Sequence, residues 1–321
     1  GHAVEVRLYA EDPARDFFPQ TGRIAALALP GAARVDAGVA EGDRVTPHYD
    51  PMIAKIVTRG ADRDAALTAM RAALAETHVG GLATNLAFLE RLVSEPDFAA
   101  ARLDTGLIAR RIGVLTGAAE PRAGDLALAA AALTGLLRPD PFTGWRAWGD
   151  GRTHVVLTDG ARDHAVTLCP APGPAGAAVI DAVTPLGPAV LQAAPLGGSR
   201  WQVRESGRTR ALHLHRDAQG VTLAREGARL FLALADPLAR AEEAGGTGDS
   251  IAAPLTGLLR SVAVATGQTV AAGEVLAVME AMKMEHSLTA PRDGRVAGIL
   301  AAPGDSVAEG TVLIALEAHD D

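Results

Sequence analysis

Lys283 stands between Met282 and Met284, two of the five methionines in the chain. Only Lys283 and Lys55 among the 30 basic residues are lysines, and the others are arginines. The segment around Lys283 joins two short apolar runs, a pattern typical of a hairpin whose tip projects one side chain. An exposed primary amine at a rigid tip suits the covalent attachment of a cofactor. The alternative is a solvent-exposed lysine with two methionines packed beside it.

Arg7 lies in a stretch of alternating apolar and polar residues, which predicts a half-buried strand over residues 4–8. By parity Arg7 shares one face of this strand with Glu5, opposite Val4 and Val6. A guanidinium held in place is a permanently charged hydrogen-bond donor, and it stabilises negative charge that develops on an oxygen. Arg7 is therefore a catalytic candidate, and an exposed arginine paired with Glu5 is the alternative.

Three weaker candidates have structural interpretations. Lys55 follows Asp50 in an apolar segment, and we interpret it as a partner in a structural ion pair. His213 and His215 alternate on one strand face, but without a third cluster of ligands we expect a solvated face rather than a metal pair. Cys169 is expected to be a small core residue. As the single cysteine it excludes an internal disulfide and suits a reducing compartment.

An internal repeat surrounds Lys283 and is expected to position it. A shift of 37 residues brings Gly267 onto Gly304 and Gly273 onto Gly310 with no gap. Both copies read as a strand, a glycine turn and a second strand. Two copies are too few for a stacked array. The repeat therefore predicts a small β domain with a pseudo-two-fold axis, and Lys283 lies between its two copies.

The N-terminal region, residues 1–112, reads as mixed α/β. Apolar residues at helical spacing predict a helix over residues 62–76, and Thr84 is expected to cap the next helix. Residues 113–124 are rich in Gly, Ala and Pro, which indicates a linker.

The middle region begins with an apolar helix that Asp125 is expected to cap and that runs to Arg138. Eight short alternating runs between residues 154 and 234 then predict a small antiparallel sandwich or barrel. Residues 236–250 are polar and Gly-rich without periodicity, which indicates a second, flexible linker.

Composition and charge exclude several classes of protein. The 321 residues are 48% hydrophobic, which excludes disorder throughout. The net charge of −8 argues against a general nucleic-acid binder. No apolar run reaches the ~18–20 residues that a membrane span needs. The chain opens on the alternating strand without a signal-peptide pattern, so we expect it to begin inside a domain.

The motif Ala281-Met282-Lys283-Met284, inside a repeated β domain with regular glycine turns, resembles the biotin carboxyl carrier family. The resemblance covers roughly residues 253–317. It implies that Lys283 is linked to biotin through an amide. Met282 and Met284 are then the flanking residues for recognition by biotin protein ligase. Related lipoyl domains usually carry Asp-Lys-Ala at the tip, which this chain lacks.

The run Gly-His-Ala-Val-Glu-Val-Arg over residues 1–7, with Asp-Pro-Met-Ile-Ala-Lys over residues 50–55, resembles the C-terminal part of biotin carboxylase, an ATP-grasp enzyme. The resemblance implies that Arg7 reaches the active site and steadies negative charge on the ureido oxygen of biotin. It also implies ATP, Mg²⁺ and bicarbonate for the complete enzyme. The family's Gly-rich nucleotide loop and its Glu/Asn/Arg/Gln/Glu run are not found here, so we expect the chain alone to be inactive.

The helix and strands of the middle region resemble the BT domain of acyl-CoA carboxylase α subunits, mainly by their order along the chain. The resemblance implies docking to a carboxyltransferase β subunit. Residues 139–142 with Trp145 and Arg146 are a candidate contact hook, and plain packing of these residues is the alternative. Residues 80–85 and 103–106 look most like the 3-methylcrotonyl-CoA carboxylase group, with propionyl-CoA and geranyl-CoA carboxylases as alternatives. An alternative of another class is a lipoyl-type carrier module of a 2-oxo acid dehydrogenase.

Together the resemblances imply a multi-domain biotin-dependent ligase subunit. The complete enzyme carboxylates biotin with ATP and bicarbonate and delivers carboxybiotin to the β subunit, which carboxylates 3-methylcrotonyl-CoA in leucine degradation. We expect a hetero-oligomer of α and β subunits in the bacterial cytoplasm or, in a eukaryote, the mitochondrial matrix, without nucleic-acid or membrane partners. The expected domains are an α+β C-terminal part of an ATP-grasp biotin carboxylase (1–112), a linker (113–124), an antiparallel β-barrel with a helix (125–235), a flexible linker (236–250) and an all-β flattened barrel-sandwich biotinyl domain (251–318).

Overall fold

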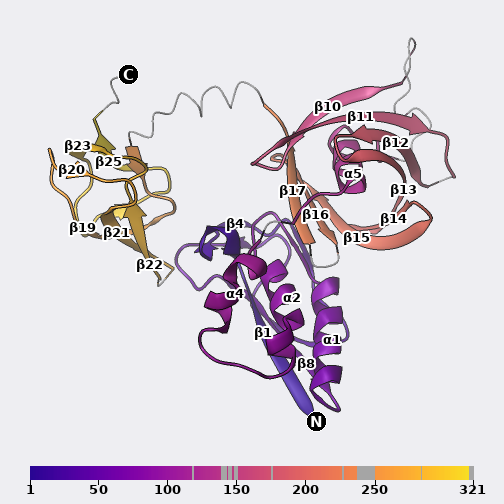
Figure 1. The fold of residues 1–321 in the computed structure, drawn as a ribbon, viewed down its shortest axis with the longest axis horizontal. Helices are drawn as coiled ribbons and strands as arrows, with labels where there is room; N and C mark the ends of the chain where they lie inside the picture. The colour runs from indigo at the N-terminus through magenta and orange to yellow at the C-terminus, as the bar shows by residue number, and fades with distance from the viewer. Residues whose placement is uncertain are drawn as a thin grey trace. The chain divides into compact units, whose positions relative to one another are not determined.

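The computed structural model describes residues 1–117, 119–138, 143, 147, 151–174, 176–225, 228–236, 250–282 and 284–317. The chain divides into two compact units, Gly1–Asp43 with Met52–Ala235 and Arg44–Pro51 with Asp236–Asp321. The first unit holds two parts, which we call the N-terminal lobe (residues 1–43 and 52–117) and the barrel (residues 119–235) (Figure 1). The second unit holds the C-terminal sandwich (residues 250–317).

The N-terminal lobe is built on a three-stranded antiparallel sheet. Its central strand β8 (Met52–Gly60) pairs with β1 (His2–Tyr9) on one side and with β6 (Arg34–Ala37) on the other. The expected strand over residues 4–8 is present as part of β1, with Val4 and Val6 buried. The short elements of the lobe are β2 (Glu11–Asp12), η1 (Pro13–Arg15), β3 (Phe18–Pro19), β4 (Gly22–Arg23), β5 (Ala26–Ala28), β9 (His78–Gly80) and α3 (Pro96–Ala99). Strand β7 (Arg44–Val45) lies in the segment that belongs to the second unit.

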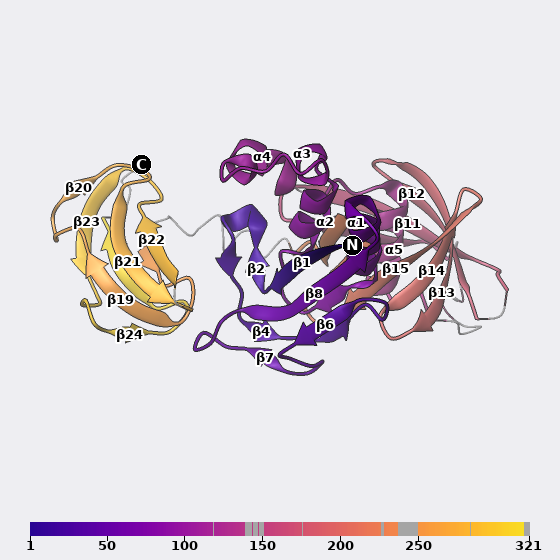
Figure 2. The same ribbon diagram turned by 90° about the horizontal axis from the view of Figure 1, so that it is seen from below.

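Helices α1 (Arg63–Glu76) and α2 (Leu86–Ser94) pack against this sheet (Figure 2). The Asp62 side chain accepts a hydrogen bond from the backbone N–H of Ala65 at 2.8 Å and so caps α1. Helix α4 (Leu107–Leu115) follows α2 and α3 along the chain. The prediction that Thr84 caps α2 is wrong by one residue. The N-cap position of α2 is Asn85, whose side chain bonds to strand β1 instead.

The barrel is a closed eight-stranded antiparallel sheet, in which consecutive strands pair and β10 closes the ring with β17. This confirms the barrel expected from the eight alternating runs. Its strands are β10 (Thr153–Thr158), β11 (Asp163–Ala171), β12 (Ala178–Thr184), β13 (Gly187–Gly197), β14 (Arg200–Glu205), β15 (Arg208–Arg216), β16 (Val221–Arg225) and β17 (Ala228–Leu234).

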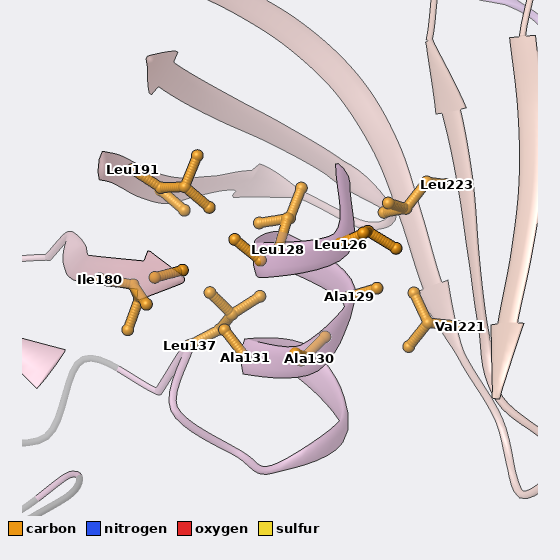
Figure 3. Packing of buried hydrophobic residues seen from close by; sticks show 14 of the residues in the cluster. Leu126, Leu128, Ala129, Ala130, Ala131, Leu137, Ile180, Leu191, Val221 and Leu223 are labelled. Carbon is orange, nitrogen blue, oxygen red and sulfur yellow. The ribbon is translucent and has the colours of Figure 1, made fainter. Parts of the chain in front are cut away.

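Helix α5 (Ala123–Leu133) lies inside the barrel and is buried on all sides (Figure 3). Leu126 and Leu128 belong to one buried cluster with inward side chains of the strands, among them Ile180, Leu191 and Leu223. A helix whose residues are apolar on every side is stable only where all of its faces are shielded from water. The run of alanines in α5 keeps the helix thin enough for a barrel of eight strands, whose interior holds little more than side chains.

The expected cap of α5 is corrected by the structure. Asp125 lies in the third helical position, and its Oδ2 accepts from the backbone N–H of Arg122 at 3.0 Å. Arg122 occupies the N-cap, so the carboxylate acts from inside the first turn in a capping-box arrangement. The helix ends at Leu133 rather than at Arg138, because Gly135 adopts a positive φ of 79°.

The C-terminal sandwich consists of two four-stranded sheets, ordered β18-β25-β23-β20 and β22-β21-β19-β24. Its strands are β18 (Ser250–Ala252), β19 (Gly257–Val262), β20 (Thr269–Val270), β21 (Val275–Ala281), β22 (Met284–Thr289), β23 (Gly294–Ile299), β24 (Ser306–Val307) and β25 (Val312–Leu316). The 37-residue shift maps β19 onto β23, β20 onto β24 and the start of β21 onto that of β25. Each sheet holds strands of both copies, so the copies are interleaved and the predicted pseudo-two-fold β domain is confirmed.

Four glycines at the repeated turns explain the gapless match. Gly267 and Gly304 have φ of 84° and 97°, and Gly273 and Gly310 have φ of 83° and 81°. A side chain is strained in this left-handed region, so glycine is the residue that these turns need. Among the helices that the structure describes, none has the length and apolar content to cross a membrane.

Candidate functional site

The hairpin that carries the candidate attachment lysine is formed by β21 and β22. Its register pairs Ala281 with Met284, so the chain passes from one strand to the other through residues 282 and 283. Met282 has a φ of 52°, the left-handed conformation that two-residue hairpin loops favour. Lys283 itself lies outside the described residues. The backbone on both sides of it nevertheless defines a tight turn.

The two methionines beside Lys283 have different environments. Met282 is buried, with 6% of its surface exposed, whereas Met284 is 36% exposed. From the sequence alone the two methionines look equivalent. In the structure Met282 is packed in the interior, whereas Met284 lies at the surface. A Cβ on Gly257 would lie 2.5 Å from the carbonyl oxygen of Glu280, so glycine is needed where β19 passes this end of the hairpin. Glu280 also forms an ion pair with Arg260.

Arg7 lies on the exposed face of the N-terminal sheet, as the parity of β1 predicts. Its Nε donates to Oε1 of Glu5 at 3.4 Å, and the two side chains are 57% and 44% exposed. Hydrogen bonds from Arg7 to the side chains of Tyr9 and Glu5 raise the pKa of Arg7 above its ordinary value. The ion pair named as the alternative is therefore present, and it leaves the guanidinium accessible.

Lys55 lies directly across from Arg7 in the register of β1 and β8, and across from Asp36 in the register of β8 and β6. Glu5, Arg7, Lys55 and Asp36 thus form a charged patch on one sheet face. The ion pair of Lys55 with Asp50 stays a prediction.

Asn85 holds the backbone of β1 beside Arg7, and the sequence analysis did not single it out as a functional residue. Its Oδ1 accepts from the backbone N–H of Tyr9 at 2.9 Å, and its Nδ2 donates to the carbonyl oxygen of Arg7 at 3.2 Å. Asn85 is 5% exposed. The only sequence signal for this role is its place in the Gly-Gly-Leu-Ala-Thr-Asn run of residues 80–85.

The predicted solvated face of His213 and His215 is wrong. His213 is 6% exposed, and its ring stacks on that of His78 with centroids 4.7 Å apart and planes 6° from parallel. The ring of His215 lies against Gly80, where an added Cβ would come within 2.9 Å. This part of the barrel surface is covered by the N-terminal lobe, which periodicity within the barrel strands does not reveal. We call the contact the lobe–barrel junction (residues 78–85 with His213, His215 and Arg229).

Replacing His78 with phenylalanine is expected to weaken the pH dependence of stability. Burial, followed by the charge of Arg229, lowers the pKa of His78 from 6.5 to about 2. Below pH 6.5 His78 therefore binds a proton in the unfolded chain but stays neutral in the folded chain. The free energy of unfolding falls on this account by about 1.4 kcal/mol per pH unit as the pH drops. Urea unfolding between pH 7.5 and pH 5, followed by tryptophan fluorescence, measures this slope.

His154→Phe is the matched control, because His154 is exposed on β10 and lies away from the junction. It should keep the wild-type slope. Equal slopes for wild type and His78→Phe would show that the buried ring does not titrate on unfolding and would contradict the prediction.

The remaining candidates are placed as follows. Cys169 is half-buried on β11 and does not belong to the barrel core, so its expected core position is wrong. The proposed hook at residues 139–142, with Trp145 and Arg146, lies outside the described residues. In the described part of the chain, no three His, Cys, Asp or Glu side chains gather into a group suited to a metal ion.

Comparison with known proteins matches two parts of the chain to families. Residues 5–110 match the biotin carboxylase C-terminal domain, and residues 247–316 match the biotin-requiring enzyme family. Methylcrotonoyl-CoA carboxylase subunit alpha, mitochondrial, of Dictyostelium discoideum is 32% identical over 313 residues, which cover 89% of this chain and 44% of that protein. The protein of the same name from Mus musculus is 44% identical over 111 residues, which cover 34% of this chain and 16% of that protein.

Among solved structures, a single-chain, multi-domain long-chain acyl-CoA carboxylase is 22% identical. The match covers 99% of this chain and 21% of that chain, with a TM-score of 0.34. The chain thus spans less than half the length of the curated relatives it matches.

Proposed function

Because this chain joins a biotin carboxylase C-terminal domain to a biotin-requiring domain, we propose that it is the C-terminal part of the α subunit of an acyl-CoA carboxylase. The proposed substrate of the complete enzyme is 3-methylcrotonyl-CoA, since relatives named methylcrotonoyl-CoA carboxylase subunit alpha match both most of the chain and its parts. Propionyl-CoA and geranyl-CoA are the alternatives. Turnover of these three acyl-CoA compounds by the complete enzyme distinguishes them.

The observation that carries the proposal is the hairpin between β21 and β22. The two residues between Ala281 and Met284 connect paired strands, and the left-handed Met282 makes this connection tight. A cofactor amide-linked to Lys283 would be held at the end of a rigid sandwich. Biotin on this lysine would carry the carboxyl group between two active sites. Met282 would fix the loop from inside, and the exposed Met284 would offer a contact to biotin protein ligase.

The N-terminal lobe supplies Arg7 to the proposed biotin carboxylation. The strand sets the direction in which the Arg7 side chain leaves the backbone, and the guanidinium donors would stabilise negative charge on the ureido oxygen of biotin. ATP, Mg²⁺ and bicarbonate are proposed as requirements of the complete protein. The barrel is proposed to dock a carboxyltransferase β subunit.

The proposed domain boundaries are residues 1–112 for the carboxylase part, 125–235 for the docking barrel and 251–318 for the biotinyl domain. Residues 113–124 and 236–250 are the proposed linkers between them.

Coexpression with a biotin protein ligase should add one biotin to the chain, and Lys283→Arg should abolish the increment. Intact-mass spectrometry measures both. Lys55→Arg is the matched control, because Lys55 is the other lysine of the chain, and it should keep the increment. Loss of biotin in Lys55→Arg instead, or a lipoyl increment on the wild type, would overturn the assignment.

A further inference from the structure

The bonds that Asn85 makes to β1 lie where the sheet itself is irregular. The pairing of β1 with β8 shifts between Leu8 and Tyr9, so the regular ladder is interrupted next to Arg7. Asn85 compensates on both sides of this irregularity. Its side chain bonds to the N–H of Tyr9 and to the carbonyl of Arg7, and its own backbone N–H donates to the carbonyl of Tyr9 at 3.2 Å. The direction in which Arg7 leaves the strand therefore depends on where Asn85 lies.

Asn85 is in turn fixed from the barrel by Arg229 of β17. The Arg229 guanidinium donates to Oγ1 of Thr84 at 3.2 Å, and to the carbonyl oxygens of Val79 at 2.5 Å and Leu82 at 3.0 Å. One side chain thus holds both ends of the segment that precedes Asn85.

The same segment has little freedom of its own. Gly81 has a φ of 97°, and a Cβ there would lie 2.4 Å from the carbonyl oxygen of Arg23. A cavity of about 580 Å³, lined by both parts of the first unit, opens beside Arg229. Arg229 makes three hydrogen bonds across the junction beside this cavity.

We infer that Arg229 is a positioning residue for Arg7, acting across the lobe–barrel junction through Thr84 and Asn85. This inference rests on the proposed function, which makes Arg7 catalytic. Arg229 holds the segment of residues 79–84 in place, and this fixes the position of the adjacent Asn85. The hydrogen bonds of Asn85 to β1 then fix the backbone at Arg7. The position of the barrel relative to the N-terminal lobe therefore affects the geometry of Arg7. No barrel residue needs to contact the substrate for this effect.

The test uses the full-length protein with free biotin and measures biotin-dependent ATP hydrolysis. Arg229→Met should lower kcat about 5- to 20-fold, which lies within the roughly 2- to 30-fold range of couplings through a packed network, while KM for ATP stays within about twofold. Arg229→Lys keeps a charge and a donor, and it should recover part of the loss. Exchange of the Tyr9 N–H, measured by hydrogen–deuterium exchange, should rise in Arg229→Met, because this group donates to Asn85.

Arg216→Met is the matched control. Arg216 is also a barrel arginine that donates to a backbone carbonyl, that of Ala132 at 2.9 Å, but its bond stays inside the barrel. It should change kcat by less than about twofold. Equal kcat values for Arg216→Met and Arg229→Met would overturn the inference.

A double variant separates this inference from the proposed function. If Arg229 acts through Arg7, then Arg229→Met should cause no further loss in an Arg7→Met background. Additive losses would show that Arg229 acts by another route, which overturns the inference and leaves Arg7 catalytic. Full biotin-dependent activity of Arg7→Met would instead refute the proposed role of Arg7, and the inference would fail with it.

Discussion

Arg7→Met in the full-length protein is expected to lower kcat for biotin carboxylation by about 10²- to 10³-fold, the usual cost of removing one donor to a developing oxyanion. The guanidinium projects from a sheet strand, carries a permanent charge and is 57% exposed on the open face. Methionine has a similar length and no donor, so the loss reports the hydrogen bonds and charge rather than a change of packing. Bicarbonate-dependent ATP hydrolysis with saturating free biotin measures it.

Arg7→Lys and Arg34→Met sharpen this experiment. Lysine keeps the charge but loses the planar fork, so Arg7→Lys should lie between wild type and Arg7→Met. Arg34 lies on β6 of the same sheet, where it pairs with Asp36 at 3.1 Å and is 75% exposed. Arg34→Met should retain nearly full activity. A similar loss in Arg34→Met and Arg7→Met would mean that the general charge of the face matters, not the position of Arg7.

Asp125→Ala is expected to destabilise the barrel by about 3–5 kcal/mol, because it leaves a buried cation without its counter-charge. Asp125 is fully buried at the start of α5. Its Oδ2 accepts from Nε of Arg225 at 2.8 Å, and its Oδ1 lies 3.5 Å from a terminal nitrogen of Arg210. The same carboxylate accepts from the backbone N–H of Arg122. Removing it therefore breaks the helix cap and the ion pairs together.

Urea unfolding of the whole chain, followed by tryptophan fluorescence, measures this loss. Asp36→Ala removes an acid of an exposed ion pair and serves as the control, with an expected loss of about 0–1 kcal/mol. A loss for Asp125→Ala as small as that of the control would show that Arg225 finds another partner or water, and would contradict the prediction.

The C-terminal sandwich was the most predictable part of the fold. Glycines at fixed spacing mark its turns, because the left-handed backbone there admits few other residues. The exchange of strands between the two copies was not readable, since a repeat gives the elements of each copy but not which copy pairs with which. The opposite environments of Met282 and Met284 also needed the structure, because the turn that buries one and exposes the other is a three-dimensional feature.

In the candidate site, too, some features were predictable from the sequence and others needed the structure. Alternation along β1 predicts the face on which Arg7 lies, because the period of a strand is a local property. The same reasoning failed for His213 and His215, since it shows which residues share a face but not what covers that face. The N-terminal lobe covers it, and the residues that meet there are far apart in the chain.

The sequence by itself determined the eight barrel strands, the internal repeat and the identity of the chemically capable residues. Turn residues and hydrophobic periodicity are properties of short segments, so they can be recognised without knowing what each segment packs against. Only the tertiary structure decided the burial of Asp125, the stack of His78 on His213 and the reach of Arg229 to Thr84, which lies 145 residues earlier. Each of these features forms where two elements distant in the chain pack together. The free energy of such a contact depends on both elements, so the sequence of one segment does not predict it.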